Sequence, residues 1–363
     1  MRSELLEILC CPGCGSARLE VAEVAAGFGG EIEEGVLRCA ACDRFYAITE
    51  GISCLVTEDL NELVPVHLLE QHARAGGEFG ETLGRYIDRI KRSNARSREA
   101  QWSLDDVRYW EHEYRDGDEA RRSLEAMLAA RPDAGNRTYP RERYLFSRLR
   151  PELTGGVMLD LGCGLAQTIR VICDPETVGY SYIGADLSFS ALRAARGTLR
   201  GDFVQCTADR PPFLAASVDA LVMLGTLHHL PDNQRALERA VQLVRPGGFI
   251  ACHEVTRRGA RNTARRRILV GSRSESTHNE AIDAEAALAF LAKEAEILVA
   301  KREYSALRGL LVRWLDASMR TRPALTRLVL GLDSAFLATI GRLRPALGSH
   351  GILVLARKFP HPR

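Results

Sequence analysis

Several features that would define a membrane or secreted protein are missing from the sequence. None of its apolar runs reaches 18 residues, so no segment is expected to cross a membrane as a helix. The first residues carry charge but no apolar core followed by a small-residue cleavage site, so no secretory leader is expected. Ten cysteines without an export signal fit a reducing compartment, where thiols bind metal or pack as small apolar groups. The cytoplasm is therefore the expected location.

An excess of charge of one sign is also missing. The 49 lysines and arginines nearly balance the 47 aspartates and glutamates, which leaves a net charge of +2. This balance gives no global attraction to nucleic acid, so a nucleic-acid partner is not expected. The strongest basic run, Arg257–Arg267, is interpreted as a solvated loop, with contact to phosphate or RNA as the alternative. Nothing in the sequence predicts the oligomeric state.

What the sequence does contain falls into four zones, because 363 residues exceed one small domain. Residues 1–56 hold two pairs of cysteines, and residues 57–136 are polar with helical periodicity, which predicts a helical linker or lid. Residues 137–256 alternate short Val/Ile/Leu runs with helical stretches, whereas residues 257–363 are rich in Ala and Leu and end in an apolar run. The alternation predicts an α/β fold with a doubly wound, Rossmann-like, mostly parallel sheet, which the last zone completes with a helical cap and strands.

Polar residues gather where the predicted strands end. The segments GVMLDLG, SYIGADL, DFVQCTAD, SVDALVMLG and GGFIACHEV are interpreted as five strands. The carboxyl ends of parallel strands meet at one edge of the sheet, and ligands of such sheets bind there. The side chains expected at this edge are those of Asp160, Asp186, Asp209, His228 and Glu254.

The first predicted strand runs into a glycine loop, VMLDLGCGLAQT. A dinucleotide fingerprint would need a glycine or alanine where Gln167 stands, and no phosphate-binding P-loop sequence is present. The carboxylate of Asp160, just before Gly162 and Gly164, would repel a phosphate and attract an ammonium group. A cationic nucleoside without phosphate, such as S-adenosylmethionine, meets this electrostatic demand.

This loop and the segments after it resemble the class I S-adenosylmethionine-dependent methyltransferases over roughly residues 137–256, although Ala166 stands where a third glycine is common. TADRPPF, SVDALVMLGTLHHLPD and LVRPGGFIACHE resemble the later motifs of that family, in the same order. The resemblance implies that Asp160 and the Gly162–Gly164 loop lie along the methionine part of the cofactor. It also implies that Asp186 binds the two ribose hydroxyls and that Ala208 and Asp209 border the adenine. The predicted cofactor-binding residues are Asp160, Gly162, Cys163, Gly164, Asp186, Leu187, Ala208, Asp209 and Leu224.

Two cysteine pairs of the Cys-x-x-Cys type lie in the first zone, Cys11 with Cys14 and Cys39 with Cys42. Two such knuckles supply four thiolates, which complete a closed tetrahedral site, so a structural Zn²⁺ in a zinc ribbon is predicted. The segment is similar to the small zinc-ribbon protein that activates several tRNA, rRNA and protein methyltransferases. Fusion to a catalytic domain would make that partner permanent.

Candidates for a general base follow the last predicted strands. Methyl transfer from a sulfonium is an in-line displacement, in which the enzyme aligns the acceptor and removes its proton where needed. The candidate catalytic residues are His228, His229, His253 and Glu254. His278 is expected to be a loop residue without function. Residues 324–343 are interpreted as a helical cap over an apolar substrate pocket, with an ordinary core helix and an interfacial membrane helix as the alternatives.

The sequence therefore favours a methyltransferase acting on an O or C atom of a small molecule, of the secondary-metabolite, lipid or sugar class. No Asn-Pro-Pro-Tyr type segment ends the fourth strand, which argues against amine methylation of adenine or glutamine. An RNA methyltransferase is the first alternative, and a non-methylating S-adenosylmethionine-binding enzyme such as a cyclase is the second.

Overall fold

The structure is a computed structural model. It describes residues 1–113 apart from 75 and 94–97, then 155–166, 169, 179–256, 281–303 and 351–360, with a few positions between 328 and 339. The basic run at 257–267, His278 and most of the proposed cap at 324–343 lie outside the described residues. None of the helices in the described part is long and apolar enough to cross a membrane.

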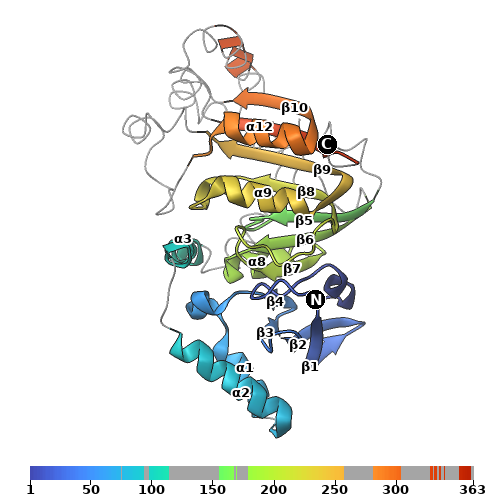
Figure 1. Ribbon diagram of the computed structural model, residues 1–363, viewed down its shortest axis with the longest axis vertical. Coiled ribbons are helices and arrows are strands. Elements are labelled where there is room, and N and C mark those ends of the chain that lie inside the picture. Colours follow the sequence, from blue (N-terminus) through green and yellow to red (C-terminus); the bar gives the residue numbers. More distant parts are fainter. Residues whose placement is uncertain are drawn as a thin grey trace.

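One sheet of eleven strands runs through the whole described molecule, in the order β1-β2-β3-β4-β7-β6-β5-β8-β9-β11-β10 (Figure 1). Its strands are Leu19–Phe28 (β1), Glu31–Cys39 (β2), Phe45–Thr49 (β3), Ile52–Cys54 (β4), Gly156–Leu161 (β5), Tyr180–Asp186 (β6), Asp202–Gln205 (β7), Val218–Leu224 (β8), Val244–Val255 (β9), Ala295–Glu303 (β10) and Gly351–Lys358 (β11).

The half of the sheet that follows β4 has the predicted doubly wound form. Strands β7, β6, β5, β8 and β9 pair in parallel, and β11 runs antiparallel between β9 and β10. The strand order reverses direction between β5 and β8, so the crevice for a ligand opens beyond the carboxyl ends of these strands. The α/β prediction is confirmed.

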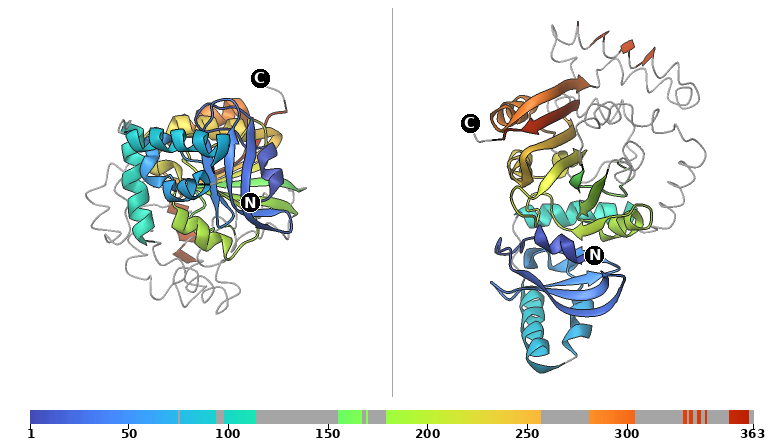
Figure 2. Two further views of the ribbon diagram at one scale, coloured as in Figure 1. Left: turned by 90° about the horizontal axis from the view of Figure 1, so that it is seen from below. Right: turned by 90° about the vertical axis from the view of Figure 1, so that its right-hand side faces the viewer.

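Helices cover both faces of this half. Asn233–Leu243 (α9) and Ala284–Glu294 (α12) bury Ala, Leu and Val side chains against one face, and Phe189–Arg196 (α8) buries Leu192 and Ala195 against the other (Figure 2). Each begins at a polar cap: Ser188, Asp232 and Asp283 accept hydrogen bonds from amides of their first turns, which satisfies donors that the helix cannot.

The N-terminal strands continue this sheet as an antiparallel ribbon. β4 pairs in parallel with β7, Ile52 opposite Phe203, and so joins the ribbon to the strand beside β6. Both the amide and the guanidinium of Arg2 donate to Asp202, at 2.8 and 2.9 Å. Buried Leu9 forms a bridge with Phe213, and one apolar core holds both residues. The ribbon and the doubly wound half therefore share one sheet and one core.

Three helices link the ribbon to the strand ends. Val66–Ala73 (α1) and Gly77–Arg92 (α2) pack on the ribbon around Phe45 and Tyr86, after a 3-10 segment at Glu58–Leu63 (η2). The third, Arg98–Glu113 (α3), leaves the ribbon and lies beside α8 (Figure 1). This places α3 over the carboxyl ends of the parallel strands.

Candidate active site and metal site

A cavity of about 240 Å³ lies at the carboxyl ends of β5, β6, β7 and β8. It is lined by strand-end residues and by one face of α3. Two carboxylates line it, those of Asp106 and Asp186, and no lysine or arginine does so in the part of the chain that the structure describes. The strand-end residues lining it include Gly162, Cys163, Gly164, Asp186, Leu187, Ala208 and Leu224.

The glycine loop lines the cavity at a point where a side chain would not fit. Gly162 has a φ of +78°, and a Cβ on it would lie 2.3 Å from the Oγ1 of Thr226. That hydroxyl is held in place, since it donates to the carbonyl of Leu161 at 2.9 Å. Glycine is therefore required at this position by both its backbone angle and its contact.

Asp186 joins the glycine loop to the start of α8. Its Oδ2 accepts from the amide of Gly164 at 2.8 Å, and its Oδ1 accepts from the amide of Ser188 at 2.9 Å. Burial raises the pKa of Asp186, and the hydrogen bonds from these two backbone amides oppose the rise. Each carboxylate oxygen can accept a further hydrogen bond, so the side chain can receive two neighbouring hydroxyls.

Asp160 and Asp209, both predicted cofactor contacts, do not line the cavity. Asp160 is buried and accepts a hydrogen bond from the hydroxyl of Tyr182 at 2.9 Å. Burial, with the nearby charge of Asp186, raises its pKa to about 7. Asp209 borders a neighbouring hollow, and its buried Oδ1 has no hydrogen-bond partner among the described residues. Their roles at the cofactor stay predictions.

His228 and Glu254, two candidate bases, face each other away from the cavity lining. The Nδ1 of His228 lies 2.9 Å from the Oε2 of Glu254, whose Oε1 accepts from the amides of Thr226 and Leu227 at 2.8 Å each. Burial would raise the pKa of Glu254, but these hydrogen bonds outweigh it and lower the pKa. The pair thus fixes the loop after β8. His253 does not line the cavity either, and its carbonyl accepts from the amide of Gly225 at 2.8 Å.

His229 is the one candidate base that lines the cavity in the described part of the chain. Its Nδ1 lies 3.4 Å from the Oδ1 of Asp106, and its ring contacts Trp110 edge to face at 5.6 Å between centroids. Burial would lower the pKa of His229, but the carboxylate of Asp106 outweighs it and raises the pKa. The carbonyl of His229 accepts from the indole of Trp102 at 2.7 Å.

Sequence reasoning predicted a helical linker or lid over residues 57–136 but named none of the α3 residues that line the cavity, which are Ser103, Asp106, Val107 and Trp110. The helix is tied to α8 through Glu111, whose carboxylate accepts hydrogen bonds from the hydroxyls of Ser188 and Ser190. A signal was present, because Trp102, Asp106 and Trp110 recur every four residues and so share one helical face.

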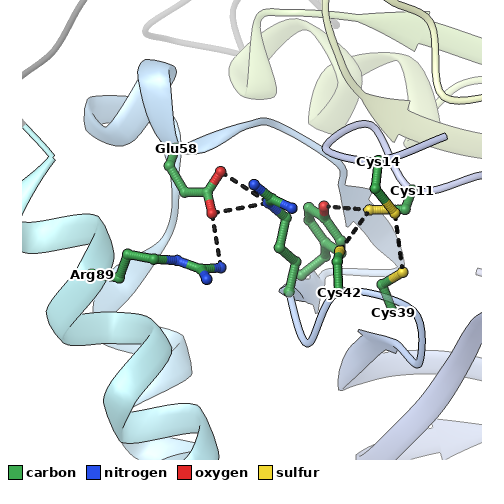
Figure 3. Close-up of polar contacts among 8 residues, drawn as sticks. Cys11, Cys14, Cys39, Cys42, Glu58 and Arg89 are labelled. Carbon is green, nitrogen blue, oxygen red and sulfur yellow. Dashed lines mark hydrogen bonds and ion pairs between the residues drawn. The ribbon is translucent and has the colours of Figure 1, made fainter. Parts of the chain in front are cut away.

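The four predicted zinc ligands come together at one end of the ribbon (Figure 3). The sulfur atoms of Cys11, Cys14, Cys39 and Cys42 lie within 4.8 Å of one another, and two pairs are 3.7 Å apart. A tetrahedral zinc with Zn–S bonds of about 2.3 Å would separate its sulfurs by about 3.8 Å. The donor set and its spacing therefore fit a closed, structural zinc site, with all four positions taken by protein.

An arginine beside the cluster connects it to α2. Burial would raise the pKa of the Cys42 thiol, but hydrogen bonds from Arg44 and the neighbouring thiols lower it to about 7. The Nε of Arg44 also donates to Glu58 at 2.9 Å, and Glu58 pairs with Arg89 of α2 at 2.9 Å (Figure 3). The metal knuckle and the α1–α2 helices therefore share one polar network.

Two family models match the chain. Residues 159–252 match a methyltransferase domain, and residues 2–51 match the Trm112p-like proteins. The chain carries a class I S-adenosylmethionine-dependent methyltransferase domain behind a Trm112-like domain. Both resemblances found in the sequence are confirmed, and S-adenosylmethionine is the cofactor that a methyltransferase domain of this class implies.

The names of similar proteins indicate different kinds of methyl acceptor. The chain is 26% identical over 119 residues to the probable tRNA methyltransferase 9B of Homo sapiens, over 32% of this chain and 24% of that protein. It is 29% identical over 116 residues to the ubiquinone biosynthesis O-methyltransferase of Escherichia coli, over 30% of this chain and 46% of that protein. The chain thus spans less than half the length of either relative.

A solved complex between the Haloferax volcanii Trm112 methyltransferase activator and a methyltransferase is also similar. It shares 14% identity with a TM-score of 0.40, and the match covers 65% of this chain and 98% of that chain.

Proposed function

We propose that the protein transfers a methyl group from S-adenosylmethionine to an O or C atom of a small molecule. The observation that carries this proposal is the charge of the cavity, where Asp106 and Asp186 face a space that no lysine or arginine of the described chain lines. A sulfonium and an ammonium group are stabilised in such a space, and a pyrophosphate is not.

The proposed placement of S-adenosylmethionine follows from which cavity residues suit each part of the cofactor. The carboxylate of Asp186, held by the amides of Gly164 and Ser188, accepts hydrogen bonds from the two ribose hydroxyls. The Gly162–Gly164 loop lies along the methionine part of the cofactor. Ala208 borders the adenine, and Asp209, the next residue, keeps its predicted place at the adenine edge. When bound, S-adenosylmethionine supplies an electrophilic methyl group.

His229 is proposed as the general base. When Nδ1 carries the proton and faces Asp106, the other ring nitrogen, Nε2, is the proposed site that takes a proton from an acceptor hydroxyl. Trp110 and the backbone contact from Trp102 hold the ring in place. Because Asp106 raises the pKa of His229, the base is lost as the pH falls through that raised value.

The experiment measures transfer of tritiated methyl groups by the full chain into the organic-extractable and RNA fractions of a cell extract. We expect label in the organic-extractable fraction, about 100-fold less label with His229→Gln, and an acidic limb of the pH–rate profile that moves to lower pH with Asp106→Asn. Asp105→Asn, one position along α3, is the matched control. Tight cofactor binding with no transfer to any fraction would contradict the proposal.

RNA methylation is the second candidate. It is favoured by the similarity of the domain to a protein named as a probable tRNA methyltransferase and by the Trm112-like domain. Label confined to the RNA fraction in the same experiment would select it.

A further inference from the structure

A second hollow, of about 290 Å³, lies beside the cofactor cavity and is lined mainly by charged residues. Three arginines contribute to it, Arg210 after β7 and Arg235 and Arg239 on α9, together with Asp209 and Asp232. Arg235 and Arg239 are four residues apart and therefore lie on one face of the helix. Three guanidinium groups around one hollow contrast with the cofactor cavity, which none lines in the described chain.

The charges of this hollow are only partly compensated. Arg210 pairs with Asp59 at 2.9 Å and lies 3.8 Å from Asp209. The carboxylate of Asp232 serves the start of α9 by accepting from the amide of Arg235 at 3.0 Å. Arg239 donates to a backbone carbonyl, that of Asp209, at 2.6 Å. In the described chain neither Arg235 nor Arg239 forms an ion pair with a carboxylate.

The hollow adjoins the cofactor cavity along two stretches of chain. Asp209 directly follows Ala208, and the Pro231–Asp232 pair directly follows Leu230; both Ala208 and Leu230 line the cavity. A ligand seated in the hollow is therefore next to the cofactor cavity, and its Pro231 side is two residues from His229, the proposed base. Two carboxylates and no arginine of the described chain line the cofactor cavity, whereas three arginines and two carboxylates line the hollow, so an anionic group is better stabilised in the hollow.

We propose that this hollow binds a phosphate group of the methyl acceptor, an inference that rests on the proposed methyltransferase function. Guanidinium groups bind phosphate oxygens through paired N–H donors, and Arg235 and Arg239 have such donors to offer. The negative charge of Asp209 opposes this binding, but its Oδ2 lies 3.8 Å from the Nε of Arg210, which partly compensates it. The phosphate can belong to a phosphorylated metabolite or to an RNA backbone, which share this chemistry.

The experiment titrates the full chain with inorganic pyrophosphate and with a fluorescein-labelled RNA hairpin, and with S-adenosylhomocysteine in a separate titration. The variants are Arg235→Glu and Arg239→Gln. Arg85→Glu, an exposed arginine of α2 that bonds Thr82, is the control because it changes net charge equally at a distance.

We expect wild-type chain to bind pyrophosphate, and Arg235→Glu to weaken that binding by about tenfold or more while Arg85→Glu changes it by less than about twofold. A parallel loss for the RNA hairpin would assign the phosphate to RNA, and a loss for pyrophosphate alone would assign it to a small acceptor. Absence of pyrophosphate and RNA binding, or equal losses in Arg235→Glu and Arg85→Glu, would overturn the inference. Failure of the methyltransferase proposal is distinguished separately, because it would remove S-adenosylhomocysteine binding from the wild-type chain itself.

Discussion

The cofactor cavity has two walls that are built by different means. The strand-end wall (Gly162, Gly164, Asp186, Ala208 and Leu224) rests on backbone hydrogen bonds between parallel strands. The α3 wall (Ser103, Asp106, Val107 and Trp110) rests on side-chain contacts, chiefly those of Glu111 and Trp102. The comparison teaches that the first wall belongs to the fold, whereas the second is attached to it and can be loosened without unfolding the sheet.

The largest effect is expected from removing the metal, because the ribbon continues the sheet that carries the strand-end wall. Cys14→Ser should abolish zinc binding and lower the melting temperature by more than about 10 °C, since metal binding contributes directly to folding. Metal content and thermal unfolding measure both. Cys10→Ser, next to the first knuckle but outside the four-sulfur cluster, should keep one zinc per chain. A stable, metal-free Cys14→Ser chain would contradict the role of the ribbon.

Gly162→Ala tests the strand-end wall itself. The substitution adds a Cβ 2.3 Å from a fixed hydroxyl at a φ of +78°, so it should cost about 3 kcal/mol or more of unfolding free energy and abolish cofactor binding. Gly179→Ala is the matched control, because its φ is +72° but nothing lies within 4 Å of the added Cβ. The control should cost about 1–2 kcal/mol and leave cofactor affinity intact. Equal effects of the two variants would show that the contact with Thr226 is unimportant.

The pH dependence of stability tests the carboxylate beneath the strand-end wall. The pKa of Asp160 is raised from 3.8 to about 7 in the folded chain, so the folded state binds more protons than the unfolded state between these values. Stability should therefore fall as the pH rises from 4 to 7, by up to about 4 kcal/mol from this group. Asp160→Asn should remove that slope in urea unfolding, and exposed Asp88→Asn should not. An unchanged slope in Asp160→Asn would refute the assignment.

The smallest effect is expected at the α3 wall. Glu111→Gln weakens the bonds to Ser188 and Ser190, so it should cost only about 1–2 kcal/mol while speeding release of S-adenosylhomocysteine in stopped-flow measurements. Asp105→Asn, on the same helix, should change stability by less than about 0.5 kcal/mol. If Glu111→Gln cost as much as Gly162→Ala, the distinction between the walls would be wrong.

The same distinction explains what the sequence could and could not predict. The parallel sheet, the glycine loop and the zinc cluster follow from local spacing and backbone geometry, so patterns in the chain indicate them. The buried position of Asp160 depends on Tyr182 of the neighbouring strand, which packs on the same face of the sheet. A strand-end rule does not distinguish this buried aspartate from Asp186, which lines the cavity.

Neighbouring histidines show the limit of motif reasoning most clearly. His228 and His229 occupy one 3-10 turn, yet the first meets Glu254 and the second meets Asp106. Which of the two lines the cavity is decided by a helix more than a hundred residues earlier in the chain, and no spacing within the turn reports it. The α3 face could have been found from its four-residue periodicity, but its docking on α8 could not.

The central claim is that the carboxylates of Asp186, at a strand end, and Asp106, on α3, form a site for a cationic nucleoside without phosphate. Isothermal titration of the full chain with S-adenosylmethionine and, separately, with NAD tests it most directly. The account predicts binding of one S-adenosylmethionine per chain with a dissociation constant in the micromolar range, and binding of NAD no tighter than that of inorganic pyrophosphate, whose proposed site is the neighbouring hollow. Binding of NAD with no heat from S-adenosylmethionine would contradict it.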